Sequence, residues 1–130
     1  MTHVPAPIRI EVLARTDCAN RGMALQVVER AVAESGVAVE LQVVDVKSEA
    51  HAKKRRFLGS PSVLVDGVDV EPGAVGRTDF TLRDRIYRCG HGGLQGWPDQ
   101  RWIRSALLVA TVQSGSSGNG SSETSSATSP

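Results

Sequence analysis

The chain has 130 residues, with 40% hydrophobic residues, 22% charged residues and a formal net charge of +1. This length suits one domain with one hydrophobic core. A nearly neutral chain has no general electrostatic attraction to nucleic acid or to an anionic membrane, so neither is an expected partner. No apolar run approaches the roughly 20 residues of a membrane-spanning helix, and residues 1–7 lack a secretory signal pattern.

The chain contains two cysteines, Cys18 and Cys89. Two are too few for a disulfide scaffold, and we expect them to be thiols in a reducing compartment. The sequence therefore predicts a cytoplasmic protein.

The first part of the sequence predicts a strand, a helix and a second strand. Residues 8–13 alternate apolar and polar side chains, as a half-buried strand does. Thr16 or Asp17 is expected to cap the following helix, and Gly36 to end it. A valine-rich strand follows at residues 37–46. The buried stripe of the helix is expected to consist of Ala24, Val27, Val28, Ala31 and Val32.

The middle of the sequence predicts a short helix and then a hairpin. The helix spans residues 49–58, with Ser48 as its cap and Gly59 at its end. Its buried face is expected to contain Ala50, Phe57 and Leu58. Two short apolar runs, 63–65 and 68–70, are separated by Asp66 and Gly67, a pair that favours a type I′ hairpin turn.

The last part of the sequence predicts a short helix at residues 80–88 and a final helix from Asp99. One face of the final helix carries Trp102, Ile103, Ala106, Leu107 and Ala110. Residues 113–130 are almost entirely Ser, Gly and Thr, and we expect them to form a disordered tail.

These elements predict an α/β fold. A β-α-β unit forms a parallel strand pair with a right-handed crossover, and the hairpin adds two antiparallel strands. The order β-α-β-α-β-β-α over residues 8–112 then gives a thioredoxin-like three-layer fold with a four-stranded mixed sheet. Residues 1–7 are expected to be a flexible N-terminus. The main alternative is a split β-α-β sandwich.

Cys18 lies between the first strand and the first helix. Unpaired amide groups and the helix dipole at such a position favour a thiolate, which is the nucleophilic form. Arg15 and Arg21 flank it and favour the thiolate further, whereas Asp17 opposes it. Position 21 holds no second cysteine, so the C-x-x-C pair of dithiol oxidoreductases is absent. Two interpretations stay open: a reactive monothiol and an inert, half-buried side chain.

Pro61 directly precedes the third predicted strand. It occupies the place at which thioredoxin-like proteins carry a cis-proline beside the active cysteine, and we favour a cis bond over an ordinary trans proline. Segments 8–13, 17–20, 57–63, 65–72 and 94–98 resemble a bacterial family of small thioredoxin-like proteins, some of them labelled alkylmercury lyase. FLGSP at residues 57–61 and DVEP at residues 69–72 are the most specific parts, and the resemblance covers about residues 8–110.

The resemblance implies a thioredoxin-like fold with a cysteine at the start of the first helix, here Cys18. The family carries Cys-Pro-Asn at this point, and this chain has Ala19 in place of the proline. The family also carries a second cysteine in a Leu-x-Cys-Arg-x-Tyr segment, where this chain has Asp84. Cys89 lies a few residues further on. We therefore name Cys18, Pro61 and Cys89 as the candidate catalytic residues. Two interpretations of Cys89 stay open: a resolving thiol, and a loop cysteine that shares no task with Cys18.

Two functional hypotheses follow. The first is a thiol-redox protein in which Cys18 exchanges with a disulfide- or thiol-containing protein or a small thiol, while Pro61 shapes a substrate groove. The second is a non-catalytic binding module for a partner protein, or for a soft metal such as mercury held by Cys18 and Cys89 with His91 or His51. Because no paired metal-binding spacing is present, we predict no metal and no cofactor.

Two groups of charged residues are interpreted as solvated surface. The basic run at residues 53–56 has no interleaved aromatic residues, so we do not expect it to bind nucleic acid. The loosely clustered acids are expected to lie on the surface without catalytic pairing: Asp66, Asp69, Glu71, Asp79 and Asp84.

Overall fold

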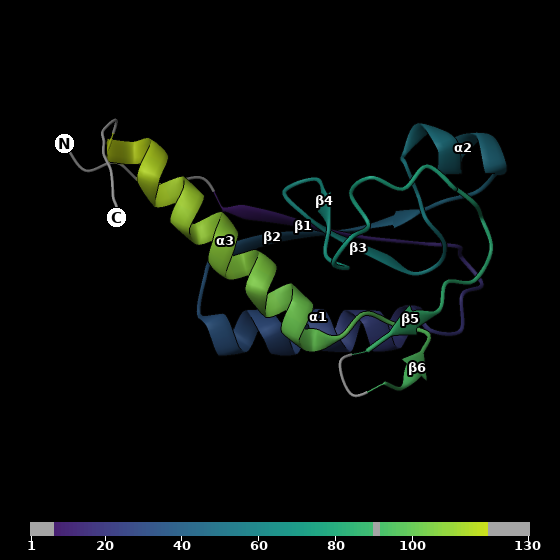
Figure 1. The fold of residues 1–130 in the computed structure, drawn as a ribbon, viewed down its shortest axis with the longest axis horizontal. Coiled ribbons are helices and arrows are strands. Elements are labelled where there is room, and N and C mark those ends of the chain that lie inside the picture. The colour runs from purple at the N-terminus through teal and green to yellow at the C-terminus, as the bar shows by residue number, and fades with distance from the viewer. Residues whose placement is uncertain (1–6, 90–91, 120–130) are drawn as a thin grey trace.

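The computed structural model describes residues 7–89 and 92–119. It is a mixed α/β structure with a four-stranded sheet, a two-stranded hairpin and three helices (Figure 1). The elements in chain order are β1 (Ile8–Ala14), α1 (Arg21–Ser35), β2 (Val39–Asp45), α2 (Glu49–Lys54), β3 (Ser62–Val65), β4 (Val68–Asp69), β5 (Tyr87–Arg88), β6 (Leu94–Gln95) and α3 (Gln100–Asn119).

The main sheet has the strand order β2-β1-β3-β4. β1 pairs with β2 in parallel, with Ile8 opposite Val39, and pairs with β3 antiparallel, with Val12 opposite Val63. β3 and β4 form an antiparallel hairpin. The prediction of an α/β fold with a four-stranded mixed sheet is therefore confirmed.

Helices lie on both faces of this sheet. Alternate β1 residues, including Ile10 and Val12, face a core that contains residues of α1 and α3. Leu13 points to the opposite face and packs with Ala52 of α2 and with Phe57. The strand β1 is therefore buried on both sides near its C-terminal end. Among the described residues, no helix has the length and apolarity needed to cross a membrane.

The ends of α1 differ in how well the sequence predicted them. Gly36 ends the helix in the left-handed conformation and donates its N–H to the Val32 carbonyl, as predicted. The start is at Arg21, and the N-cap residue is Asn20, whose side chain makes no capping hydrogen bond. The expected caps, Thr16 and Asp17, lie too far upstream. An added Cβ on Gly96 would be 2.1 Å from Asn20 Nδ2, so the Asn20 side chain packs directly against this glycine.

The helix α2 is shorter than predicted. Ser48 caps it by accepting a hydrogen bond from the His51 N–H, but the helix ends at Lys54 and Arg56 adopts a positive φ of 55°. The buried helical residue is Ala52, whereas Ala50 is exposed. Phe57 and Leu58 are buried, as expected, but they follow the helix instead of forming its face.

The hairpin turn agrees with its prediction, because Asp66 and Gly67 both have positive φ angles, of 49° and 82°.

The prediction of a helix at residues 80–88 is wrong. Its backbone groups bond to another segment: Thr81 N–H donates to the Phe57 carbonyl and Arg85 N–H to the Ser60 carbonyl. Residues 81–85 therefore run alongside residues 57–60 and lead into β5.

The helix α3 packs through the predicted residues Ile103, Leu107 and Ala110. Trp102 is half-buried and its ring centroid lies 6.0 Å from that of Tyr87. The helix extends to Asn119 and so includes the first residues of the segment expected to form a tail. Residues 1–6 and 120–130 lie outside the described residues.

Gly59 is the closest point between the segment before β3 and the segment before β5. It has a φ of 126°, and an added Cβ would lie 2.8 Å from Arg85 Cβ. Gly73 also has a positive φ, of 84°, but its added Cβ would meet nothing within 4 Å.

We predict that Gly73→Ala lowers the free energy of unfolding by about 1–2 kcal/mol, through backbone strain alone. Gly59→Ala should cost about 2 kcal/mol more, because it adds a clash.

Urea unfolding of the two variants measures this difference. Equal losses would show that the close approach of Gly59 to Arg85 does not constrain the fold.

Candidate functional site

Cys18 lies in the loop that connects β1 to α1, three residues before the first residue of the helix. Its N–H donates to the Arg15 carbonyl at 3.1 Å, and its own carbonyl accepts from the Arg21 N–H at 3.4 Å. The residue is half-buried. Local backbone hydrogen bonds therefore hold Cys18 at the C-terminal end of β1 with part of its surface open to solvent.

Arg15 ties this loop to two other segments. Its backbone N–H donates to Ser60 Oγ at 3.0 Å. Its guanidinium donates to the Leu82 carbonyl at 3.0 Å and forms ion pairs with Asp84 at 2.6 Å and Asp17 at 3.2 Å. Burial opposes the charged form, but the two carboxylates outweigh it and raise the pKa of Arg15. Arg15 therefore joins the Cys18 loop, the residue before Pro61, and the segment before β5.

The arginines beside Cys18 do not supply free positive charge. Arg15 is paired with Asp17 and Asp84, and the Arg21 guanidinium bonds to Asp45 at 3.0 Å. The positive end of α1 is different, because its first turn contains no acidic residue and Asn20 makes no capping hydrogen bond. The positive end of the α1 dipole therefore lies next to the Cys18 loop without a side-chain cap from Asn20.

Pro61 lies directly before β3, and the Ser60–Pro61 peptide bond is cis, as expected. Its side chain is fully buried, and its carbonyl accepts a hydrogen bond from the Tyr87 hydroxyl. The backbone of Ser60 is also occupied: its N–H donates to the Arg83 carbonyl at 2.8 Å and its carbonyl accepts from the Arg85 N–H at 2.9 Å. The backbone groups of Ser60, directly before Pro61, are therefore paired with the segment before β5.

Arg85 is a buried charged residue that the sequence analysis did not single out. Its side chain is 3% exposed and forms ion pairs with Asp69 at 2.7 Å and Glu71 at 2.6 Å. It also donates to Ser62 Oγ at 2.9 Å, and its guanidinium carbon lies 4.5 Å from the Tyr87 ring centroid. Burial opposes the charge, but the hydrogen bonds that Arg85 donates to Asp69 and Glu71 hold its pKa above the usual value.

This cluster corrects the interpretation of the acidic residues as surface charge. Asp69 and Glu71, which belong to the DVEP segment, are partners of a buried cation and are largely buried themselves. Asp84 is exposed but is paired with Arg15. The available signal was two acids at spacing i, i+2 at the end of the hairpin strand β4, but the sequence did not identify their partner.

The basic run at residues 53–56 is also partly engaged. The Arg55 guanidinium bonds to Glu11 at 2.8 Å, and Arg56 lies over the Phe80 ring at 4.9 Å. Lys53 and Lys54 are exposed. Half of the run therefore holds α2 and the following loop to their neighbours.

Cys89 lies at the end of the β5 strand in a very different environment. It is 4% exposed, its N–H donates to the Gly93 carbonyl, and its carbonyl accepts from the Gly92 N–H. Burial raises the pKa of the Cys89 thiol, and the nearby carboxylate of Asp99 raises it further. Cys89 is therefore a buried thiol with a raised pKa. Both cysteines are free in the structure.

Within residues 7–89 and 92–119, no group of three or more His, Cys, Asp and Glu residues has the arrangement of a metal site. His51 accepts a hydrogen bond from the Lys47 N–H through Nδ1. His91 lies outside the described residues. The described geometry therefore gives no support to the soft-metal hypothesis.

Neither a protein-family model nor a curated protein sequence matches this chain. The similarity to the bacterial thioredoxin-like family stays a prediction from the sequence.

The buried cluster of Arg85 generates a stability prediction. Replacing Arg85 with Met should lower the free energy of unfolding by about 3–5 kcal/mol, because Asp69 and Glu71 would remain buried without their cation. Arg83→Met is the matched control: Arg83 is exposed and lies two residues away, and its loss should cost less than about 0.5 kcal/mol. Urea denaturation measures both values. Similar effects of the two substitutions would contradict the assignment of Arg85 as a structural centre.

Proposed function

We propose that this protein is a thioredoxin-like thiol-redox protein in which Cys18 carries out thiol–disulfide exchange. The observation that carries the proposal is the contrast between the two cysteines. Cys18 is partly exposed in the loop between β1 and α1, whereas Cys89 is buried and has a raised pKa. An external disulfide therefore has access to only one of the two thiols.

The topology supports the finer assignment to a thioredoxin-like fold. A parallel β1–β2 pair continues through β3 and β4 as antiparallel strands, with α1 and α3 on one face and α2 on the other. Cys18 follows the central strand β1, and Pro61 precedes the adjacent strand β3. This is the placement that the family resemblance implies for the reactive cysteine and the proline.

The proposed reaction has two exchange steps. The Cys18 thiolate attacks one sulfur of a substrate disulfide, so that a Cys18–sulfur bond forms, the substrate S–S bond breaks, and one substrate thiolate leaves. A small-molecule thiolate then attacks the mixed disulfide, forms a new disulfide with the substrate sulfur, and releases the Cys18 thiolate. The small thiol is the co-reactant, because Cys18 has no neighbouring cysteine in its turn.

The structure favours an external thiol over Cys89 as the resolving group. Cys89 is buried and has a raised pKa, and its backbone is hydrogen-bonded to Gly92 and Gly93. A thiol with a raised pKa contributes little thiolate at neutral pH. We therefore propose Cys18 as nucleophile, Pro61 as a buried support for the adjacent strand, and no direct chemical role for Cys89.

The proposed partners are a disulfide- or thiol-containing protein or a small thiol. We place the protein in the cytoplasm, because a reducing compartment keeps thiols such as Cys18 and Cys89 unoxidised.

The alternative function is a non-catalytic binding module. It is favoured by the segment before β5, which already occupies the backbone groups of Ser60, and by the full burial of Pro61. A protein that binds a substrate backbone in a groove at Pro61 would leave the N–H and carbonyl groups of Ser60 unpaired for that substrate. The two functions differ in whether Cys18 is required for any exchange activity.

We predict that Cys18→Ser reduces the exchange of a small-molecule disulfide with a small thiol to the uncatalysed rate. Cys89→Ser should keep the wild-type rate within about 2-fold, because Cys89 is inaccessible. The measurement is the rate of mixed-disulfide product formation with each full-length variant and with wild type. If Cys18→Ser retains the wild-type rate, the catalytic proposal fails and the binding module becomes the better description.

A further inference from the structure

A small pocket lies on the face of the main sheet that α2 covers. It has a volume of about 240 Å³ and is bounded by the loop after α2, the β3–β4 hairpin and residues 74–80. We call it the Arg56 pocket, and its apolar walls are formed by Leu58, Leu64, Ala74, Val75 and Phe80. None of the candidate catalytic residues lines it, so its role is independent of the proposed thiol chemistry.

Two of the three arginines that line the Arg56 pocket already have carboxylate partners. Arg55 forms an ion pair with Glu11 at 2.8 Å. Arg77 forms one with Asp79 at 2.7 Å and a longer one with Glu71 at 3.6 Å. Because a carboxylate in contact with a guanidinium offsets its charge, these two arginines contribute little net charge to the pocket.

Arg56 is the third arginine, and no acidic side chain in residues 7–89 and 92–119 pairs with it. Its guanidinium carbon lies 4.9 Å from the centroid of the Phe80 ring, so a cation–π contact holds the cation against a wall of the pocket. Asp69 also lines the pocket, but its carboxylate is bound by the buried Arg85. Arg56 therefore gives the pocket one cation that the chain does not pair.

The backbone at Arg56 is unusual for a residue with a side chain. Arg56 has a φ of 55°, in the left-handed region, and directly follows the C-cap residue of α2. Glycine is favoured at such a position, because a Cβ adds strain there. Strained residues of this kind are concentrated at functional sites. The strain at Arg56 therefore supports a role for its side chain in the pocket.

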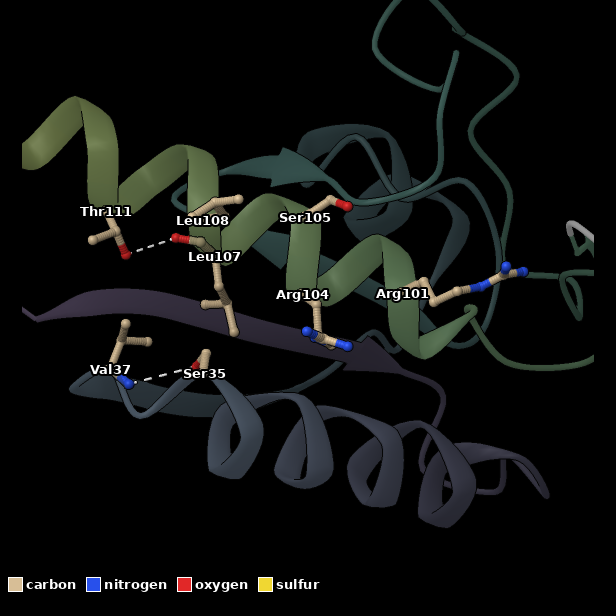
Figure 2. A pocket seen from close by; sticks show the side chains of 8 residues that line it. All are labelled: Ser35, Val37, Arg101, Arg104, Ser105, Leu107, Leu108 and Thr111. Atoms are coloured by element: carbon tan, nitrogen blue, oxygen red, sulfur yellow. Dashed lines mark hydrogen bonds between the residues drawn. The ribbon is translucent and has the colours of Figure 1, made fainter.

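A second pocket, between α3 and the end of α1, shows the contrast (Figure 2). It is larger, at about 460 Å³, and two arginines line it. Arg101 bonds to Asp99 at 2.8 Å, and Arg104 lies 3.6 Å from Glu34. Both of these cations are paired by the chain, so the second pocket offers no comparable charge to select an anion.

We propose that the Arg56 pocket binds a small organic monocarboxylate with an apolar body, such as an aromatic or branched aliphatic acid. The Arg56 guanidinium donates hydrogen bonds to the carboxylate, and the apolar walls cover the body of the ligand. One unpaired cation favours a monoanion over a phosphate group, which carries up to two negative charges. The volume is below the roughly 300 Å³ at which pockets for drug-sized ligands begin, so the ligand is a smaller molecule.

Titration of the ¹⁵N-labelled full-length protein with phenylacetate, followed by ¹H–¹⁵N correlation spectra, tests this proposal. We expect saturable shifts of the amide signals of residues that line the Arg56 pocket. Phenylacetamide keeps the ring but lacks the charge, and acetate keeps the charge but lacks the ring. Each should bind at least about 10-fold more weakly than phenylacetate, because each lacks one of the two interactions.

Two substitutions locate the site. Arg56→Gln should raise the dissociation constant of phenylacetate by about 10-fold or more, because the charged hydrogen bonds are lost. Arg104→Gln is the matched control: Arg104 lines only the second pocket, and its loss should change the constant by less than about 2-fold. The spectrum of each variant without ligand reports whether it folds, and the comparison of phenylacetate with phenylacetamide on wild type depends on neither variant.

Three results would overturn the inference. Absence of saturable shifts with phenylacetate would show that the pocket does not take an apolar acid. Equal affinity of wild type and Arg56→Gln would show that Arg56 does not hold the carboxylate. Binding of acetate as tight as that of phenylacetate would show that the apolar walls do not contribute.

Discussion

The arrangement of this molecule depends on one buried interaction, the contact of the Arg85 guanidinium with Asp69 and Glu71. Burial of a cation is costly unless opposite charges and hydrogen bonds offset the loss of its hydration. Here two carboxylates and Ser62 Oγ accept hydrogen bonds from the two terminal nitrogens of Arg85, whereas its Nε has no hydrogen-bond partner among the described residues. The acids come from β4 and the residues directly after it, whereas Arg85 comes from a segment with no regular structure of its own. The cluster therefore attaches that segment to the edge of the main sheet.

The position of Cys18 follows from this attachment. The segment that carries Arg85 pairs its backbone with Ser60, directly before Pro61, and also supplies Asp84 to Arg15. Arg15 in turn accepts the N–H of Cys18 through its carbonyl. A continuous set of hydrogen bonds and ion pairs thus connects the buried cluster to the half-buried thiol. The same contacts pair the backbone of Ser60 beside Pro61, whereas Cys18 keeps part of its surface exposed.

The sequence predicted most of the fold because local patterns determine most of it. Apolar periodicity located β1, α1 and α3, and the Asp66 and Gly67 pair located the hairpin turn. The segment at residues 80–88 was mispredicted because its conformation is set by long-range hydrogen bonds to residues 57–60, which have no local signature. For the same reason the sequence showed that Cys18 lies before a helix but gave neither the burial of Cys89 nor the partner of Asp69.

We propose that Cys18 is the thiol through which this protein reacts. Incubation of the native protein with 2-hydroxyethyl disulfide, followed by location of the adduct by peptide mass spectrometry, tests this proposal. We expect a mixed disulfide on the Cys18 peptide that added thiol reverses, while Cys89 is modified only after unfolding in urea. Absence of an adduct on Cys18 in the folded protein, under conditions in which free cysteine reacts, would contradict it. Equal modification of both cysteines before unfolding would contradict the burial of Cys89 on which the assignment depends.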